Sequence, residues 1–170
     1  LGWGNGFLDR IRKGKRLVSP GDGSTLRAYC HAQDAARAFA NAAGNSRSFG
    51  QIYHVTGEEW LTWDRYFEII AQAMDQPSPQ LVHIPCDILF AMAPDRLPDV
   101  IENYRFNNIF NNQAAQEDLG FRYTIPFSEG VRLTIAWLEL NNHIQNSDHE
   151  PFDDMIIAAW NARQTGYPLI

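Results

Sequence analysis

The sequence has few cysteines and lacks any long apolar run. Among its 170 residues only Cys30 and Cys86 are cysteines, and they fall in different expected elements. Two cysteines in different elements do not predict a disulfide framework. No run of about 18 apolar residues is present, so the sequence does not predict a membrane span either. These features, together with the absence of a signal peptide, are typical of the reducing cytoplasm, where we expect the protein to work.

Positive charge is also scarce, because the formal net charge is -6 at pH 7. Nucleic acids and anionic membranes select clustered Lys and Arg side chains, so the charge argues against either partner. The basic cluster is short and local. We interpret it as the last turn of a helix, where cations complement the carbonyl end; it comprises Arg10, Arg12, Lys13, Lys15 and Arg16.

The sequence lacks the motifs of a dinucleotide site, of a tyrosine–lysine catalytic pair and of a zinc site. No glycine fingerprint of the G-x-x-G-x-x-G type opens the chain, and no tyrosine is followed by a lysine four residues later. The histidines are scattered, and no Cys/His spacing suits zinc. Two pairs of acids, Glu58-Glu59 and Asp153-Asp154, are interpreted as a solvated loop and a first helical turn. We therefore expect no catalytic residue, cofactor motif or metal site in this chain.

Short apolar segments alternate with amphipathic ones, which indicates an α/β fold. The strands expected from this pattern are 16–19, 26–30, 51–55, 81–84 and 106–110. The expected helices are 5–14, 35–43, 62–75, 85–92, 112–120, 127–142 with Trp137 facing inward, and 151–163. Residues 93–103 contain two prolines and no clear period, so we expect a loop there. The strands are too few and too short for a complete doubly wound sheet.

The segment LRAYCHAQDAARAFANAA at 26–43, after the Gly-Asp-Gly turn at 21–23, resembles the R-x-Y-x-H-x-x-D-x-A motif of extended short-chain dehydrogenases/reductases. Further landmarks follow in the family's order: IYHVTGEEWLTWDRYFEIIA, LVHIP, FNNQAAQEDLGF and IPFSEGVRLTIAWL. The ordered set resembles the NAD-dependent epimerase/dehydratase family. It implies the C-terminal, substrate-side portion of a Rossmann-type reductase, with packed helices and an incomplete doubly wound sheet.

The resemblance divides the chain into a substrate-binding part at 1–142, a linker at 143–150 and a C-terminal helical tail at 151–170. It also implies four substrate-binding residues: Arg27, Tyr29, Arg105 and Asn107. In the family the arginine matching Arg27 commonly reaches the substrate diphosphate, and a guanidinium offers phosphate a rigid fork. A second family arginine is replaced here by Asn107 and Asn108, and Arg105 is two positions out of step.

Asp34 is expected to act as a structural cap for a helix that begins at Ala35. A lone histidine, His31, is expected to have a packing role or to hydrogen-bond a loop, since no serine or second ligand accompanies it. Alternatively, Arg27 pairs with Asp22 or Asp34 at the surface rather than binding substrate.

Two functions are compatible with the resemblance. The first is the substrate-binding portion of an NAD(P)-dependent epimerase, dehydratase or reductase that acts on a nucleotide sugar or a related hydroxyl- or carbonyl-bearing small molecule. In such an enzyme NAD or NADP and the Tyr-x-x-x-Lys pair belong to an N-terminal cofactor domain, which also carries the homodimer contacts. The isolated chain would then bind no cofactor and be inactive. The alternative is a non-catalytic binding or scaffold protein, such as the RNA-binding plant relatives.

Overall fold

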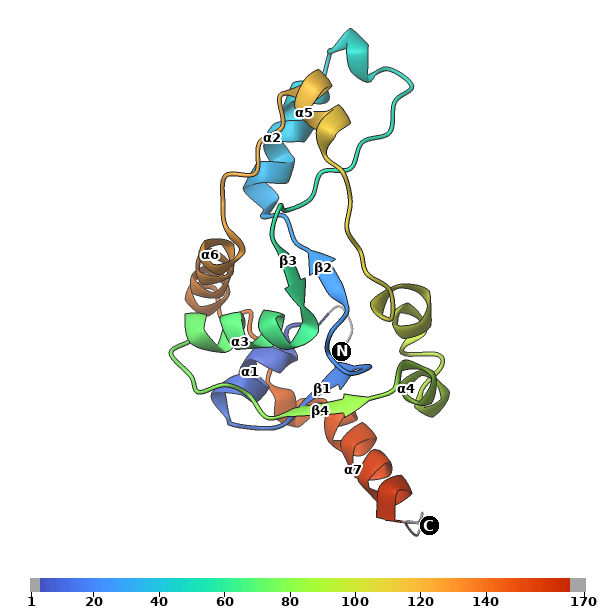
Figure 1. Cartoon of the computed structure of the whole chain (residues 1–170). Helices are drawn as coiled ribbons and strands as arrows, with labels where there is room; N and C mark the ends of the chain where they lie inside the picture. Colours follow the sequence, from blue (N-terminus) through green and yellow to red (C-terminus); the bar gives the residue numbers. More distant parts are fainter. Residues whose placement is uncertain (1–3, 166–170) are drawn as a thin grey trace.

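Short strands and longer helices alternate in the computed structural model, which describes residues 4–165 (Figure 1). The strands are β1 (Leu17–Pro20), β2 (Leu26–Ala28), β3 (Trp60–Thr62) and β4 (Leu81–Ile84). The helices are α1 (Gly6–Arg12), α2 (Ala32–Ala42), α3 (Trp63–Ala73), α4 (Cys86–Met92), α5 (Gln113–Leu119), α6 (Phe127–Leu140) and α7 (Phe152–Thr165). Single turns η1 (Ser46–Ser48), η2 (Val100–Tyr104) and η3 (Ser147–His149) complete the described elements.

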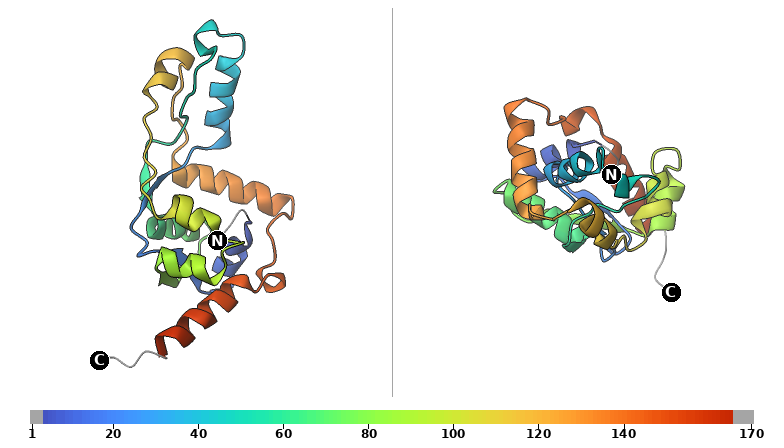
Figure 2. Two further views of the ribbon diagram at one scale, coloured as in Figure 1. Left: turned by 90° about the vertical axis from the view of Figure 1, so that its right-hand side faces the viewer. Right: turned by 90° about the horizontal axis from the view of Figure 1, so that it is seen from above.

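The strands form two separate pairs. β1 and β4 are parallel, with Leu17 opposite Leu81 and Pro20 opposite Ile84. β2 and β3 are antiparallel, with Leu26 opposite Thr62. In Figure 2, α7 runs obliquely beneath the rest of the chain, while α2 and α5 form a lobe at the opposite end. This arrangement is an α/β fold with short strands and many helices, as the sequence predicts.

Three apolar clusters hold these elements together. The first packs α1, α3 and α6 through residues such as Leu8, Phe67 and Ile135. The second packs α4 and α7 against β1 and β4, and Ile156 and Ile157 of α7 are buried in it. The third joins α2 and α5 in the distal lobe. The predicted tail helix therefore shares a core with the two parallel strands; residues 166–170 of that tail lie outside the described residues.

Two helix boundaries match the cap and stop residues in the sequence. Thr62 precedes α3 and accepts a hydrogen bond from the Arg65 backbone N–H at 3.1 Å. α5 ends at Gly120, which has a left-handed φ of 62°. Trp137 was expected to face inward, which is wrong, since its side chain is 56% exposed. The apolar repeat of Val131, Ile135 and Leu138, which the sequence also predicts to face inward, does form the inward stripe of α6.

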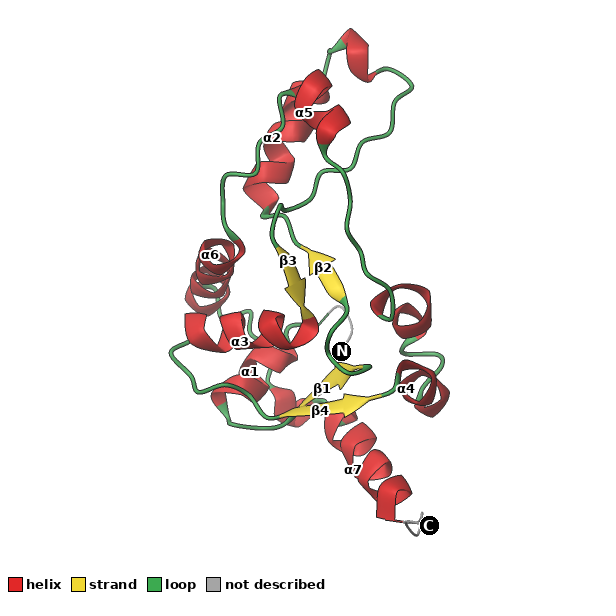
Figure 3. Ribbon diagram, viewed as in Figure 1, coloured by secondary structure: helices red, strands yellow, loops and turns green. Residues whose placement is uncertain are grey.

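Two predicted strands are absent from the described residues. Segment 51–55 is irregular, and Ile52 is 92% exposed. Segment 106–110 makes only an isolated bridge, between Asn108 and Arg27. Both predictions are wrong because a strand needs a neighbour for its backbone groups, and only β1–β4 and β2–β3 pair in the described chain (Figure 3). The expected loop at 93–103 is also wrong in part, because Val100–Tyr104 forms a π-helical turn.

The predicted helix cap at Asp34 is wrong. α2 begins three residues earlier than expected, and His31 is its N-cap, with Nδ1 accepting from the Gln33 N–H at 3.3 Å. Asp34 therefore lies within the first turn, fully buried. Its carboxylate accepts hydrogen bonds from the backbone N–H groups of Thr124 and Ile125 at 2.9 and 3.0 Å. The carboxylate thus fastens α2 to the segment that leads into α6.

Burial raises the pKa of Asp34, but hydrogen bonds from Thr124 and Ile125 and the charge of Arg37 outweigh it, and the pKa lies below its ordinary value. A carboxyl group with a lowered pKa stabilises the fold above its unfolded pKa. That stabilisation is lost as pH falls through the folded pKa.

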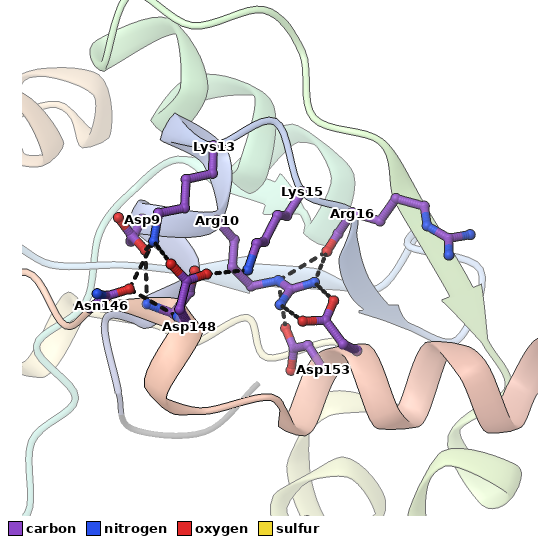
Figure 4. Close-up of polar contacts among 10 residues, drawn as sticks. Asp9, Arg10, Lys13, Lys15, Arg16, Asn146, Asp148 and Asp153 are labelled. Atoms are coloured by element: carbon purple, nitrogen blue, oxygen red, sulfur yellow. Dashed lines mark hydrogen bonds and ion pairs between the residues drawn. The ribbon is translucent and has the colours of Figure 1, made fainter.

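The basic cluster binds the acids near the end of the described chain (Figure 4). Arg10 is only 3% exposed. Its guanidinium donates to both carboxylate oxygens of Asp154 at 2.6 and 3.0 Å and to the carbonyl oxygen of Arg16 at 2.8 Å. Asp153 adds an ion pair at 3.7 Å. These bonds hold the pKa of Asp154 below its ordinary value and fasten α7 to α1.

The segment between α6 and α7 is bound to α1 by the same chemistry. Lys13 and Lys15 hydrogen-bond the carboxylate of Asp148 at 2.7 and 2.6 Å, and these bonds lower the pKa of Asp148 to about 2. Asn5, the first residue of the expected helix 5–14, precedes α1 at its N-cap position. Its side chain makes no cap bond and instead bonds the backbone of His143 and Gln145, both at 2.9 Å.

Replacing Arg10 should destabilise the protein strongly. The substitution Arg10→Met removes the guanidinium bonds to Asp154 and to the carbonyl oxygen of Arg16, so we expect the free energy of unfolding to fall by about 2 kcal/mol. Urea titration measures the loss. The matched control is Arg12→Met, which breaks an ion pair with Glu139 whose two side chains are about half exposed. That variant should stay within about 0.5 kcal/mol of the unaltered chain. Equal losses would contradict the anchoring role of Arg10.

The pH dependence of stability isolates Asp34. Asp34→Asn should lower the free energy of unfolding by about 2 kcal/mol at neutral pH, because charge-assisted bonds to two backbone N–H groups are lost. The deficit should be constant above about pH 4 and shrink as pH falls further, since the unaltered carboxyl then becomes protonated as well. Urea midpoints at pH 7, 4 and 3 test this, with the exposed Asp95→Asn as control. A deficit that grows on acidification refutes it.

Candidate functional site

A cavity of about 510 Å³ opens between β2 and the helices α1, α3 and α6, which lie to the left of β2 in Figure 1. Its wall is formed mainly by aromatic and aliphatic side chains. Arg27 and Tyr29, two of the four predicted substrate-binding residues, line it. Phe7 and Leu8 come from α1, Tyr66 and Phe67 from α3, and Phe127, Val131 and Ile135 from α6.

Arg27 is held among aromatic rings. Its guanidinium carbon lies 4.9 Å from the ring centroid of Trp63, 5.0 Å from that of Tyr104 and 5.9 Å from that of Tyr29. Cation–π attraction stabilises the charge in this setting. Nη1 donates to Asn103 Oδ1 at 3.1 Å. Nε is buried and has no hydrogen-bond partner among the described residues. The surface pairing with Asp22 or Asp34 is not found; Asp34 pairs with Arg37.

Tyr29 belongs to a stack of rings beside this cation. Its ring centroid lies 4.8 Å from that of Tyr66 and 5.1 Å from that of Phe127. Burial raises the pKa of Tyr29 to about 12, although the neighbouring Arg27 charge acts in the opposite direction. The phenol therefore stays protonated at neutral pH. It can donate a hydrogen bond or pack against a ligand, but it does not act as a base there.

Arg105 and Asn107 lie apart from the described wall of the cavity. Asn107 Oδ1 accepts a hydrogen bond from the Leu26 N–H at 2.8 Å, which fixes the start of β2. The Arg105 guanidinium carbon lies 4.7 Å from the ring centroid of Phe106. Neither side chain is among the described residues that line the cavity. The structure brings two of the four predicted residues together and leaves these two outside.

Glu59 helps to form the cavity wall, a role that the sequence analysis missed. It was assigned to a solvated loop, which is wrong, because its Oε2 accepts a hydrogen bond from the Phe127 N–H at 2.6 Å and another from the Tyr123 hydroxyl. The carboxylate therefore satisfies the first backbone donor of α6 and positions Phe127 in the cavity wall. The partners are separated by 64 and 68 residues, so no local pattern could have indicated the contact.

Another polar group lies at the start of α3. Asp64 accepts a hydrogen bond from the fully buried hydroxyl of Ser19 at 3.1 Å, and His83 Nε2 lies 2.9 Å from the same carboxylate oxygen. Asp64 thus stands between the serine and the histidine. Nucleophilic catalysis requires the histidine next to the hydroxyl, so this arrangement is unsuited to it.

Two strand-to-helix junctions of the described chain differ from those of dinucleotide sites. Such sites place a glycine-rich turn between a strand and the N-terminus of a helix, where backbone N–H groups hold the pyrophosphate. Here β4 runs into α4 through Pro85, which has no N–H, and β3 runs directly into α3. Among helices within 4–165, none is long and apolar enough to cross a membrane.

Comparison with curated proteins gives three informative relatives. The chain is 27% identical over 135 residues to dTDP-glucose 4,6-dehydratase of Actinoplanes sp., covering 79% of this chain and 38% of that protein. It is 26% identical over 153 residues to a decarboxylating sterol-4-alpha-carboxylate 3-dehydrogenase of Schizosaccharomyces pombe, covering 79% and 45%. It is 31% identical over 77 residues to the chloroplast stem-loop binding protein of 41 kDa b of Arabidopsis thaliana, covering 45% and 20%. No family model matches the sequence.

Solved structures show the same fold. UDP-glucose 4-epimerase from Thermotoga maritima, solved with UDP-glucose, aligns with a TM-score of 0.62 at 20% identity, covering 80% of this chain and 38% of that one. UDP-glucuronic acid 4-epimerase from Bacillus cereus, solved with NAD, aligns with a TM-score of 0.60 at 12% identity, covering 79% and 38%. The chain thus spans less than half the length of these relatives. In sequence and in fold, it matches the C-terminal portion of the NAD-dependent epimerases and dehydratases, the extended short-chain dehydrogenases/reductases.

Proposed function

We propose that residues 1–142 form the substrate-binding portion of an NAD(P)-dependent epimerase, dehydratase or reductase. The observation that carries this proposal is Arg27, a cation at the wall of a cavity, with a buried Nε that has no acceptor among the described residues. A guanidinium at the wall of a cavity offers a rigid fork of N–H donors to an anionic group of a substrate. The substrate is a nucleotide sugar or a related molecule with a hydroxyl or carbonyl group.

In this proposal the chain contributes placement rather than reaction chemistry. Arg27 binds the anionic end of the substrate, and the rings of Trp63 and Tyr104 restrict the orientation of its guanidinium. Tyr29, protonated at neutral pH, offers a hydrogen-bond donor and a flat surface. Holding the remote part of a substrate lowers the entropic cost of bringing its reacting carbon into position.

A cofactor domain, which binds NAD or NADP, is the proposed partner of this chain. Several structural neighbours were solved with NAD, and the chain covers only 38% of their length. The distal lobe supports this proposal, because Phe39 of α2 and Ile52 of the unpaired segment 51–55 are largely exposed. Burying such side chains and pairing such a backbone are what a neighbouring domain with a sheet edge would achieve.

The coding sequence upstream of Leu1 tests the enzyme class. It should encode a glycine fingerprint followed by Tyr-x-x-x-Lys. The longer protein should then bind NADH, detected as energy transfer from tryptophan to the nicotinamide, whereas the 170-residue chain should show neither NADH binding nor NAD(P)H oxidation. A longer protein without these motifs, or NADH oxidation by the isolated chain, would refute the proposal.

A binding protein without enzyme activity is the second candidate, because one relative is named a chloroplast stem-loop binding protein. The basic cluster argues against RNA as the ligand, since Arg10, Lys13 and Lys15 are already paired with acids. We expect no shift of a stem-loop RNA on a native gel at 50 mM salt. A shift that weakens steeply toward 200 mM salt would instead favour this candidate, because phosphate binding releases counterions.

A further inference from the structure

The cavity beside Arg27 has the size of a small-molecule site and a largely apolar wall. Its volume of about 510 Å³ lies within the ordinary range for such sites. The flat sides of Phe7, Tyr66 and Phe127 contribute to the wall, and their rings pack within 6.3 Å of one another through Tyr66. A ligand that fills this space must therefore present apolar, preferably ring-shaped, surface to most of it.

The positive charge available to a ligand is limited. Among the described residues that line the cavity, Arg27 is the sole arginine or lysine. Asp153 also lines it, and the nearby Arg10, 3.7 Å away, is bonded more closely to Asp154. Arg105, the other predicted substrate-binding cation, lies outside the described wall. The described wall thus offers a ligand no more than one positive charge.

This charge count discriminates between ligands. A nucleoside diphosphate carries at least two negative charges, and burying the second without a counter-charge is costly. One carboxylate matches one guanidinium, and the guanidinium of Arg27 has further N–H donors besides the Nη1 that bonds Asn103.

We propose that the substrate bound here is a mainly apolar, ring-containing carboxylate rather than a nucleotide diphosphate. This proposal rests on the proposed function, because it names the substrate class of the same site. The carboxylate pairs with Arg27, and the apolar body lies against the aromatic wall formed by α1, α3 and α6.

The test uses two matched probes on the 170-residue chain, 1-pyrenebutyrate and its uncharged amide, with UDP-glucose as the third ligand. Quenching of tryptophan emission and titration calorimetry report binding. We expect 1-pyrenebutyrate to bind with one molecule per chain, and the amide to bind roughly tenfold or more weakly, since only the acid forms charge-assisted bonds with Arg27. UDP-glucose should neither bind measurably nor displace the acid.

Two variants locate the effect. Arg27→Met should bind acid and amide equally, because the discriminating charge is gone. Arg105→Met, which removes an exposed cation outside the described wall, should keep the full preference for the acid. The acid–amide comparison on the unaltered chain keeps the test decisive even if Arg27→Met does not fold.

The contrary outcomes are distinct. Equal binding of acid and amide by the unaltered chain, or a preference that survives in Arg27→Met, overturns the proposal. Binding of UDP-glucose that depends on Arg27, without binding of the acid, also overturns it and leaves the proposed enzyme class intact. An upstream sequence without a glycine fingerprint refutes the enzyme class, whatever the probes show.

Discussion

The position of one half-buried cation governs how this chain can bind a ligand. Arg27 lies on a strand of only three residues, and its guanidinium is surrounded by Trp63, Tyr104 and Tyr29. Aromatic faces stabilise the charge without neutralising it. The residues that place those rings come from distant parts of the chain, including the π-helical turn at 100–104 and the start of α3. The integrity of the site therefore depends on the packing of several elements and not on β2 alone.

What the sequence could predict is what short-range physics determines. Thr62, Gly120 and the apolar repeat of Val131, Ile135 and Leu138 act within one or two helical turns, and the helices they mark are present. Segment 51–55 has strand-like composition, but composition supplies no neighbour, and in the described chain its backbone remains outside any sheet. A strand forms only beside a neighbouring strand, and the composition of one segment does not show whether such a neighbour exists.

The candidate site was predictable in part, for a related reason. Arg27 and Tyr29 were found through the family resemblance of one continuous motif, whereas the roles of Asp34 and Glu59 depend on bonds to residues 124–127. Asp34 was expected to cap the helix that follows it in the sequence. Its carboxylate instead bonds the backbone of Thr124 and Ile125, about 90 residues away. Sequence spacing indicates bonds between a carboxylate and nearby backbone N–H groups, but it does not indicate bonds to a segment far along the chain.

The pairing of Arg10 with Asp154 spans 144 residues, so it bears on the order in which the molecule is assembled. During synthesis the carboxylate of Asp154 emerges 144 residues after the guanidinium that it neutralises. β1 lacks its parallel neighbour until β4 emerges, and it lacks the apolar cover of α7 until that helix follows. Contacts this far apart close slowly, and the unfinished surface resembles the aggregation-prone edge of a partial sheet. A nascent chain of this design benefits from a chaperone or an adjoining folded domain until α7 has emerged.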